Sequence, residues 1–210
     1  MRKNICLLVF MICATSLFAT EVKTYVTGAY NYGMFTERSD VGNTVIKSNG
    51  FDIGVATFFN EGSLGLYLNT DYNFPESTEV NIKGLSLKTS SSDWNFSMII
   101  SGIIGPVFKY NFTDNLVLNT AGGFHIAQYS LSSDYVSMLS YSFGIGGDIG
   151  LRYFPTDKLY LTTGCLLTHD FYNVSKITTA FGTSNNSDAY NFGSFRPYIG
   201  IGFNFTEHLN

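Results

Sequence analysis

The sequence predicts an all-β protein, an eight-stranded antiparallel up-and-down transmembrane β-barrel. Lys109–Leu118 aligns without a gap on Arg152–Leu161. In each copy a base and a Tyr end one strand, Thr-Asp makes a tight turn, and Leu-x-Leu opens the next strand. Asn60–Leu66 is a looser third copy. These short turns would lie at one end of the strands and longer polar connections at the other, as in a transmembrane barrel.

The composition indicates the same fold class. Charged residues make up 13% of the chain, against about 25% in soluble domains. Aromatic residues make up 16%. After the N-terminal segment, no apolar run approaches the roughly 18 residues of a membrane helix. A chain of this kind must therefore place its apolar side chains on one face by alternation.

The first 19 residues have the pattern of a signal peptide. Arg2 and Lys3 precede the apolar run Ile5–Phe18, and Ala19 stands at the cleavage point. Two alternatives stay open. The run could be a membrane helix, although it is shorter than the roughly 20 residues that a span needs. Cys13 could carry a lipid anchor, although it lacks the small preceding residue of that signal.

Residues 20–210 are then predicted to form a single barrel domain. Loss of Arg2 and Lys3 would move the formal net charge from −4 to −6, because ten bases would remain against 16 acids. This acidic balance argues against a nucleic-acid partner, which requires a basic face. Cys165 would be the one cysteine left, so we predict no internal disulfide and interpret Cys165 as a small apolar wall residue.

Eight segments alternate with the period of two that is typical of strands. The clearest is 139–154, where Leu, Tyr, Phe and Ile at most odd positions alternate with Ser, Gly, Asp and Arg at even positions. Segments of this length suffice for tilted membrane-spanning strands. The other seven are 23–35, 50–59, 64–74, 96–110, 116–128, 159–171 and 195–205.

The composition of the two faces predicts which of them meets lipid. One face carries bulky Leu, Ile and Phe. The other is mostly Gly, Ser, Asn and Ala, which suits the crowded interior of a small barrel better than a surface in water. Aromatic residues gather at the short-turn end, where an interfacial girdle is expected: Tyr110, Phe112, Tyr153, Phe154 and Tyr160.

An even strand number places both termini on one side of the membrane. The turns at 60–63, 112–115 and 155–158 are then predicted to be periplasmic. The connections at the other end are rich in Ser, Thr, Asn and Asp, and we expect mobile, surface-exposed loops there. These loops would span 36–49, 75–94, 130–138 and 172–191.

The chain resembles the small eight-stranded outer-membrane barrels, the class of OmpX, OmpW and the OmpA transmembrane domain. The resemblance rests on the turn at 110–118, its copy at 153–161, and the closing strand 196–205. Uncharacterised spirochaetal barrels of this size fit equally, so no subfamily is assigned. The resemblance implies a bacterial outer membrane, insertion by the barrel-assembly machinery, and an assembly signal at Tyr198, Ile201, Phe203 and Phe205.

We predict no catalytic, cofactor-binding or metal site, and hence no enzyme. His125 is expected on the interior face and His169 on the exterior, and their spacing fits no zinc motif. The His-x-Ser pair of the lipid A deacylases, barrels of similar size, is missing. His169 and Asp170 are adjacent on one strand and so point to opposite faces. A lipid-modifying barrel enzyme is therefore the least favoured function.

Seven charged side chains are predicted to point into the barrel, where each must pair or meet water. We interpret them as a packed polar plug, with a selectivity lining as the alternative. An eight-stranded barrel is filled by side chains, so a general porin is not expected. We place Asp52, Asp71, Asp170 and Arg196 towards the outer mouth, and Lys109, Asp148 and Arg152 towards the periplasmic end.

The segment 96–110 breaks the alternation, because it carries apolar residues on the interior face. With two residues of other strands they would form an apolar path for small hydrophobic molecules, as in OmpW-like barrels. A register shift or β-bulge is the alternative explanation. The residues of this path are Phe58, Ile99, Ile103, Val107 and Leu166.

The sequence thus predicts a monomeric, non-enzymatic outer-membrane barrel with a largely filled lumen. Its expected role is structural or adhesin-like, through its outer connections. The expected partners are outer-membrane lipid and a host or surface ligand, with no nucleic acid and no cofactor. A narrow channel for small hydrophobic solutes is the alternative function.

Overall fold

The computed structural model describes residues 21–39, 42–60, 62–82 and 85–208. The segment predicted as a signal peptide, with Cys13, lies outside the described residues. Within the described part, no helix is long and apolar enough to cross a membrane. The elements are β1 (Glu21–Ser39), β2 (Gly42–Phe59), β3 (Leu64–Ile82), β4 (Leu85–Ser90), the 3₁₀ helix η1 (Ser91–Asp93), β5 (Phe96–Thr113), β6 (Leu116–Ser132), β7 (Val136–Tyr153), β8 (Leu159–Thr179) and β9 (Gly182–His208).

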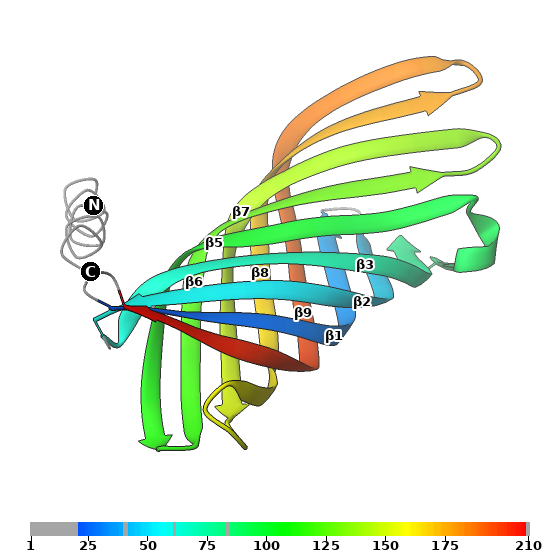
Figure 1. The fold of residues 1–210 in the computed structure, drawn as a ribbon. Helices are drawn as coiled ribbons and strands as arrows, with labels where there is room; N and C mark the ends of the chain where they lie inside the picture. Colours follow the sequence, from blue (N-terminus) through cyan, green and yellow to red (C-terminus); the bar gives the residue numbers. More distant parts are fainter. Residues whose placement is uncertain (1–20, 40–41, 61, 83–84, 209–210) are drawn as a thin grey trace, which may run out of the picture.

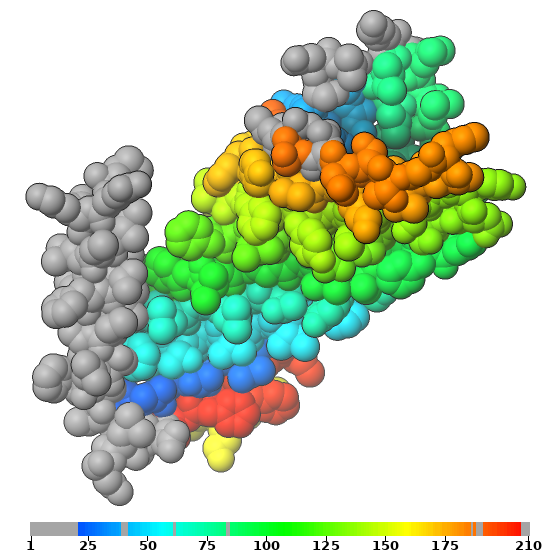
Figure 2. All heavy atoms as spheres, turned by 90° about the horizontal axis from the view of Figure 1, so that it is seen from above, coloured from blue at the N-terminus to red at the C-terminus, as the bar shows by residue number. Residues whose placement is uncertain are grey.

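The described strands form a closed antiparallel ring in the order β1-β2-β3-β5-β6-β7-β8-β9 (Figure 1). The ring closes where β1 pairs with β9, from Glu21↔His208 to Glu37↔Phe192. In Figure 2 the blue band of β1 lies beside the red band of β9. The prediction of an eight-stranded up-and-down barrel is confirmed.

The ring has a short-turn end and a hairpin end. The short-turn end holds the connections β2–β3, β5–β6 and β7–β8, together with Glu21 and His208. At the hairpin end, the β6–β7 and β8–β9 hairpins and the start of β5 extend outward, with β8–β9 drawn orange in Figure 1. The two ends are therefore built differently, as the turn repeats predicted.

The connections expected to be loops are largely β-structure, so the assignment of loops there was wrong. Strands continue through most of 36–49, 75–94, 130–138 and 172–191. The β8–β9 pairing, for example, runs out to Thr179↔Gly182. Ser, Thr and Asn occupy both faces of these strands, so the sequence has no apolar alternation there and does not predict them. Thr nevertheless favours strands, and ladder hydrogen bonds satisfy the backbone there.

The wall of the barrel has a seam between β3 and β5 at the hairpin end. The last pair between these strands is Asn73↔Ile99. Farther out, β3 pairs with the short strand β4, from Ser77↔Ser90 to Ile82↔Leu85. The first residues of β5 pair only with β6. The neighbours of β3 thus change at the level of Asn73.

The exterior of the ring is apolar and the interior is polar. On β7, Tyr141, Ile145 and Ile149 are exposed, whereas Ser142 and Asp148 are buried. The same division holds on β3 and β9, as the alternation predicted. Bulky apolar side chains on the outside of a closed sheet are what a lipid environment requires.

An aromatic girdle is present at the short-turn end, but two of its predicted members are not in it. Tyr110, Phe112 and Tyr153 are exposed, whereas Phe154 is 9% exposed and Tyr160 is 0% exposed inside the barrel. Tyr160 is at an even position of β8 and therefore shares the interior face with Thr162. The prediction was wrong because it grouped the residues by nearness to the turn and not by face.

Close packing at the short-turn end predicts a test of the fold. A Cβ at Gly202 would collide with the Tyr160 ring and with the backbone oxygen of Val26, whereas a Cβ at Gly28 meets nothing within 4 Å. Gly202→Ala should therefore destabilise the barrel by about 1–3 kcal/mol. Urea unfolding of the refolded protein in detergent measures this. Gly28→Ala is the matched control, and an equal loss in both variants would contradict the packing.

Candidate functional site

All seven charged side chains predicted for the lumen point inward, and each is at most 8% exposed. The structure does not gather them into one site. It distributes them among several sets of contacts, most of which join strands that are not consecutive in the chain: Asp52, Asp71, Lys109, Asp148, Arg152, Asp170 and Arg196.

Arg196 and Asp71 form a fully buried ion pair across the ring. Arg196 Nη1 also donates a hydrogen bond to Ser101 Oγ at 2.9 Å, and Ser101 Oγ donates to Asp71 Oδ2 at 2.5 Å. Asn73 donates to the same carboxylate, and the guanidinium lies 5.4 Å from the centre of the Phe35 ring. The network ties β9 to β3 and β5.

A second network centres on Asp170 of β8. His125 Nδ1 lies 2.6 Å from Asp170 Oδ1, and Ser142 Oγ donates to Asp170 Oδ2 at 2.5 Å. Sequence reasoning missed this pair, because His125 is 45 residues from Asp170. The only available signal was that both residues occupy interior positions. Both Ser142 and His125 bind the carboxylate, so the geometry lacks the serine-to-histidine contact of a nucleophile and its base.

Two further interior carboxylates, Asp148 and Asp52, accept hydrogen bonds from neutral groups. Asp148 accepts from the hydroxyls of Tyr67 at 2.7 Å and Tyr198 at 2.8 Å. Asp52 accepts from the Asn69 amide at 3.4 Å. Tyr198 was predicted as part of an assembly signal. Its side chain points inward, whereas Ile201, Phe203 and Phe205 are exposed on the lipid face.

The cationic side chains at the short-turn end lie against aromatic rings. The Arg152 guanidinium is 4.9 Å from the Tyr25 ring centre and 5.0 Å from that of Tyr160. Lys109 Nζ is 4.7 Å from the Phe58 ring centre. Such contacts attract a cation more strongly where water is scarce. The aromatic cluster therefore both fills this end of the lumen and holds its cations.

The five residues of the predicted apolar path are also in the interior. None is more than 2% exposed, and no register shift occurs between 99 and 107 on β5. Phe58, Ile103, Val107 and Leu166 belong to one packed cluster, and Ile99 belongs to another. Phe58, Ile103, Val107 and Leu166 are covered by their neighbours and form packed core within the plug, whereas Ile99 also lines a cavity at the hairpin end.

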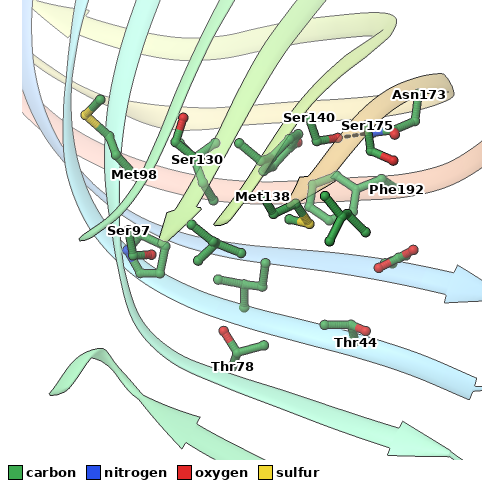
Figure 3. Close-up of a pocket in the computed structure, with 17 residues that line it drawn as sticks. Thr44, Thr78, Ser97, Met98, Ser130, Met138, Ser140, Asn173, Ser175 and Phe192 are labelled. Atoms are coloured by element: carbon green, nitrogen blue, oxygen red, sulfur yellow. Dashed lines mark hydrogen bonds between the residues drawn. The ribbon is translucent and has the colours of Figure 1, made fainter. Parts of the chain in front are cut away.

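An open cavity of about 280 Å³ lies at the hairpin end (Figure 3), and we call it the outer cavity. Tyr129, Phe192 and Ile99 form its floor. The Tyr129 and Phe192 rings meet edge to face at 4.9 Å, and Phe35 stacks on Phe192 at 5.9 Å. Its remaining lining is Glu37, Thr44, Ile46, Pro75, Thr78, Ser97, Met98, Ser130, Leu131, Met138, Ser140, Asn173, Ser175 and Ile177.

The polar wall of the outer cavity has one ordered contact and one carboxylate. Asn173 Nδ2 donates to Ser140 Oγ at 2.6 Å, as Figure 3 shows. Glu37 lies beyond Met34, where the apolar exterior band of β1 ends. Burial raises the pKa of the Glu37 carboxyl, and a hydrogen bond from Thr44 partly opposes this shift. Sequence reasoning missed the cavity, since most of its residues lie in segments read as loops.

Two other predictions about chemistry concern metals and cysteine. Among the described residues, no three His, Cys, Asp or Glu side chains come together as metal ligands. Cys165 has a free thiol and is half-buried in the wall of β8. His169 is exposed on the outer face of the same strand.

No family model and no curated protein sequence matches the chain. Solved structures do match. A major outer membrane protein of Thermus thermophilus is 11% identical, with a TM-score of 0.55 over 87% of this chain and 99% of that one. Neisserial surface protein A is 14% identical, with a TM-score of 0.52 over 87% and 97%. Ail, the attachment invasion locus protein of Yersinia pestis, is 14% identical, with a TM-score of 0.50 over 87% and 98%.

The chain thus has the fold of the small outer-membrane β-barrels, as its turn repeats and closing strand predicted. These likenesses cover nearly the whole of each solved structure. They do not single out a subfamily.

The buried ion pair predicts that removal of one charge lowers the free energy of unfolding strongly, and that removal of the second charge restores much of it. Arg196→Met would leave the Asp71 carboxylate buried without its cation and should cost about 3–5 kcal/mol. Addition of Asp71→Asn should restore much of the loss, because the uncompensated charge is then gone. Urea unfolding in detergent measures all three proteins. The exposed Arg38→Met is the control, and additive losses in the double variant would contradict the pairing.

Proposed function

We propose that the chain is a monomeric, non-enzymatic barrel of the bacterial outer membrane that presents its hairpin end as an interaction surface. The main observation that supports this proposal is that aromatic side chains are exposed at two hairpin tips. Tyr135, between β6 and β7, is 80% exposed, and Phe181, between β8 and β9, is 102% exposed. Leu85 and Leu87 of β4 are also exposed.

Exposure of large apolar side chains to water is energetically unfavourable. Large apolar side chains on the surface of a soluble region mark interaction sites when they gather. Aromatic residues are enriched among those that dominate binding energy. The tips stand on antiparallel ladders that extend from the barrel, and the β8–β9 ladder has one register shift between Asp170 and Tyr172. A rigid display of this kind lowers the entropic cost of binding a partner.

The filled interior supports a role without solute flow. The aromatic cluster at one end, the Arg196–Asp71 pair, and the Tyr129–Phe192 layer lie in series along the lumen. The orientation follows from the design of membrane barrels, in which short turns face the periplasm and longer connections face outward. Two of the similar structures are Neisserial surface protein A and the attachment invasion locus protein of Yersinia pestis, and such names agree with a role at the cell surface.

A narrow channel for small hydrophobic solutes is the second candidate. The observation that favours it is the outer cavity, which extends to the β3–β5 seam through Pro75 and Thr78 on one side and Ser97 and Met98 on the other. An apolar solute could enter there only as far as the aromatic floor. Uptake of such a solute by cells that carry the barrel would favour this candidate.

The filled lumen predicts that the barrel does not conduct ions. The refolded barrel, inserted into planar lipid bilayers, should give no stable conductance steps, because buried side chains fill the lumen. A wide porin in the same bilayers is the positive control. Regular steps that scale with salt concentration would contradict a closed lumen.

The hairpin tips predict a specific loss of adhesion. Cells of a Gram-negative host that display the variant Tyr135→Ser with Phe181→Ser should bind epithelial monolayers and one another several-fold less than cells with the original chain. The reason is that removal of each aromatic side chain should lower the binding free energy by about 1–3 kcal/mol. The control exchanges the rings, Tyr135→Phe with Phe181→Tyr, and should keep adhesion. Equal adhesion by all three strains, with equal surface levels, would refute the role of the tips.

A further inference from the structure

The floor of the outer cavity is apolar, aromatic and well supported. Phe192 is held between Phe35 and Tyr129, so three rings support one another beneath the open space. Ile46 packs against the same cluster. Leu131 and Met138 add apolar wall above it. A pocket with such a lining holds water weakly and takes apolar groups readily.

The electrostatics of the cavity come from a single side chain. Among the described residues that line it, Glu37 is the only one with a formal charge. The other polar lining groups are hydroxyls and one amide, as at Thr44, Ser140 and Asn173. Arg196 does not line the cavity and is committed to Asp71. The carboxylate therefore faces the cavity without a cation to balance it.

The carboxylate is partly withdrawn from water. It shares its level with Thr44, its partner in the β1–β2 register, and the Thr44 hydroxyl is its hydrogen-bond donor. A half-buried carboxylate with one neutral donor loses hydration and gains little in return. A cationic ligand group would restore that balance, because charge-assisted hydrogen bonds are stronger than neutral ones.

The cavity also limits the size of its occupant. Its volume of about 280 Å³ lies at the lower end of small-molecule pockets, which span about 300–1,000 Å³. It is open at the hairpin end, so an occupant can enter from the surrounding water. These dimensions suit one ring or a short alkyl chain with a polar head.

We propose that the outer cavity binds a small organic ammonium ion, with its apolar body on the Ile99–Tyr129–Phe192 floor and its ammonium group at the Glu37 carboxylate. The aromatic floor adds attraction for the positive charge. An anion would meet only a like charge here. A neutral apolar molecule would leave the carboxylate desolvated and unpaired. This site is separate from the hairpin tips, and its occupancy does not require the adhesive role.

The test compares three probes of nearly equal shape on the full barrel in lipid nanodiscs. 2-Phenylethylammonium is the cation, 2-phenylethanol the neutral compound, and 3-phenylpropionate the anion. Isothermal titration, corrected with empty nanodiscs, should show saturable binding in the order cation, alcohol, anion. Glu37→Gln should weaken the cation about tenfold and abolish its advantage over the alcohol. Binding of the alcohol should not weaken.

Two control sets separate the site from the membrane and from misfolding. Glu76→Gln removes an exposed carboxylate on the outer side of β3 and should bind like the original chain. Phe192→Leu or Tyr129→Leu should weaken cation and alcohol together, in a variant whose gel mobility, unboiled and boiled, equals that of the original chain and so reports the same folded barrel. The proposal is overturned by equal affinity for the three probes, by absence of saturable binding, or by cation binding that Glu37→Gln leaves unchanged.

Discussion

The narrow lumen is the constraint on which the structure depends, because an inward charge in an eight-stranded ring must find its partner across the ring. Arg196 on β9 reaches Asp71 on β3, and Asp170 on β8 is met by His125 from β6. A slip of one residue in any strand would turn these groups into lipid. The buried networks therefore make the wrong registers costly, and so help to define one closed barrel.

The alternation of apolar and polar residues predicted the features that belong to a single strand, such as which of its faces points into the barrel. The faces of 139–154 could be read directly, since lipid outside and packed polar groups inside give the two faces different compositions. The outer strand extensions could not be read, because Ser, Thr and Asn occupy both of their faces and no regular apolar alternation marks them. The His125–Asp170 pair was equally hidden, since sequence shows which face a residue occupies but not which strands meet across the ring. Tyr160 is the opposite case, because its even position on β8 was enough to place it on the interior face.

The two ends of the lumen use aromatic rings for different purposes. At the short-turn end, rings surround Arg152 and Lys109, so cations and aromatics satisfy one another within the protein. At the hairpin end, Phe35 covers Arg196 from one side, and the stacked Phe192 continues this layer to the cavity floor. The polar networks are thus enclosed between two aromatic layers. This arrangement keeps water from the buried charges and separates the cavity from the rest of the lumen.

The contrast between Glu37 and the plug shows where packing ends and a binding site begins. Below the aromatic floor, inward charges are held by an opposite charge, by hydroxyls or an amide, or by rings. Above it, the Glu37 carboxylate has the hydroxyl of Thr44 and faces an apolar space. A carboxylate in the plug with so little compensation would destabilise the barrel. Open water makes it tolerable in the cavity, and a ligand that excludes this water must supply the missing charge.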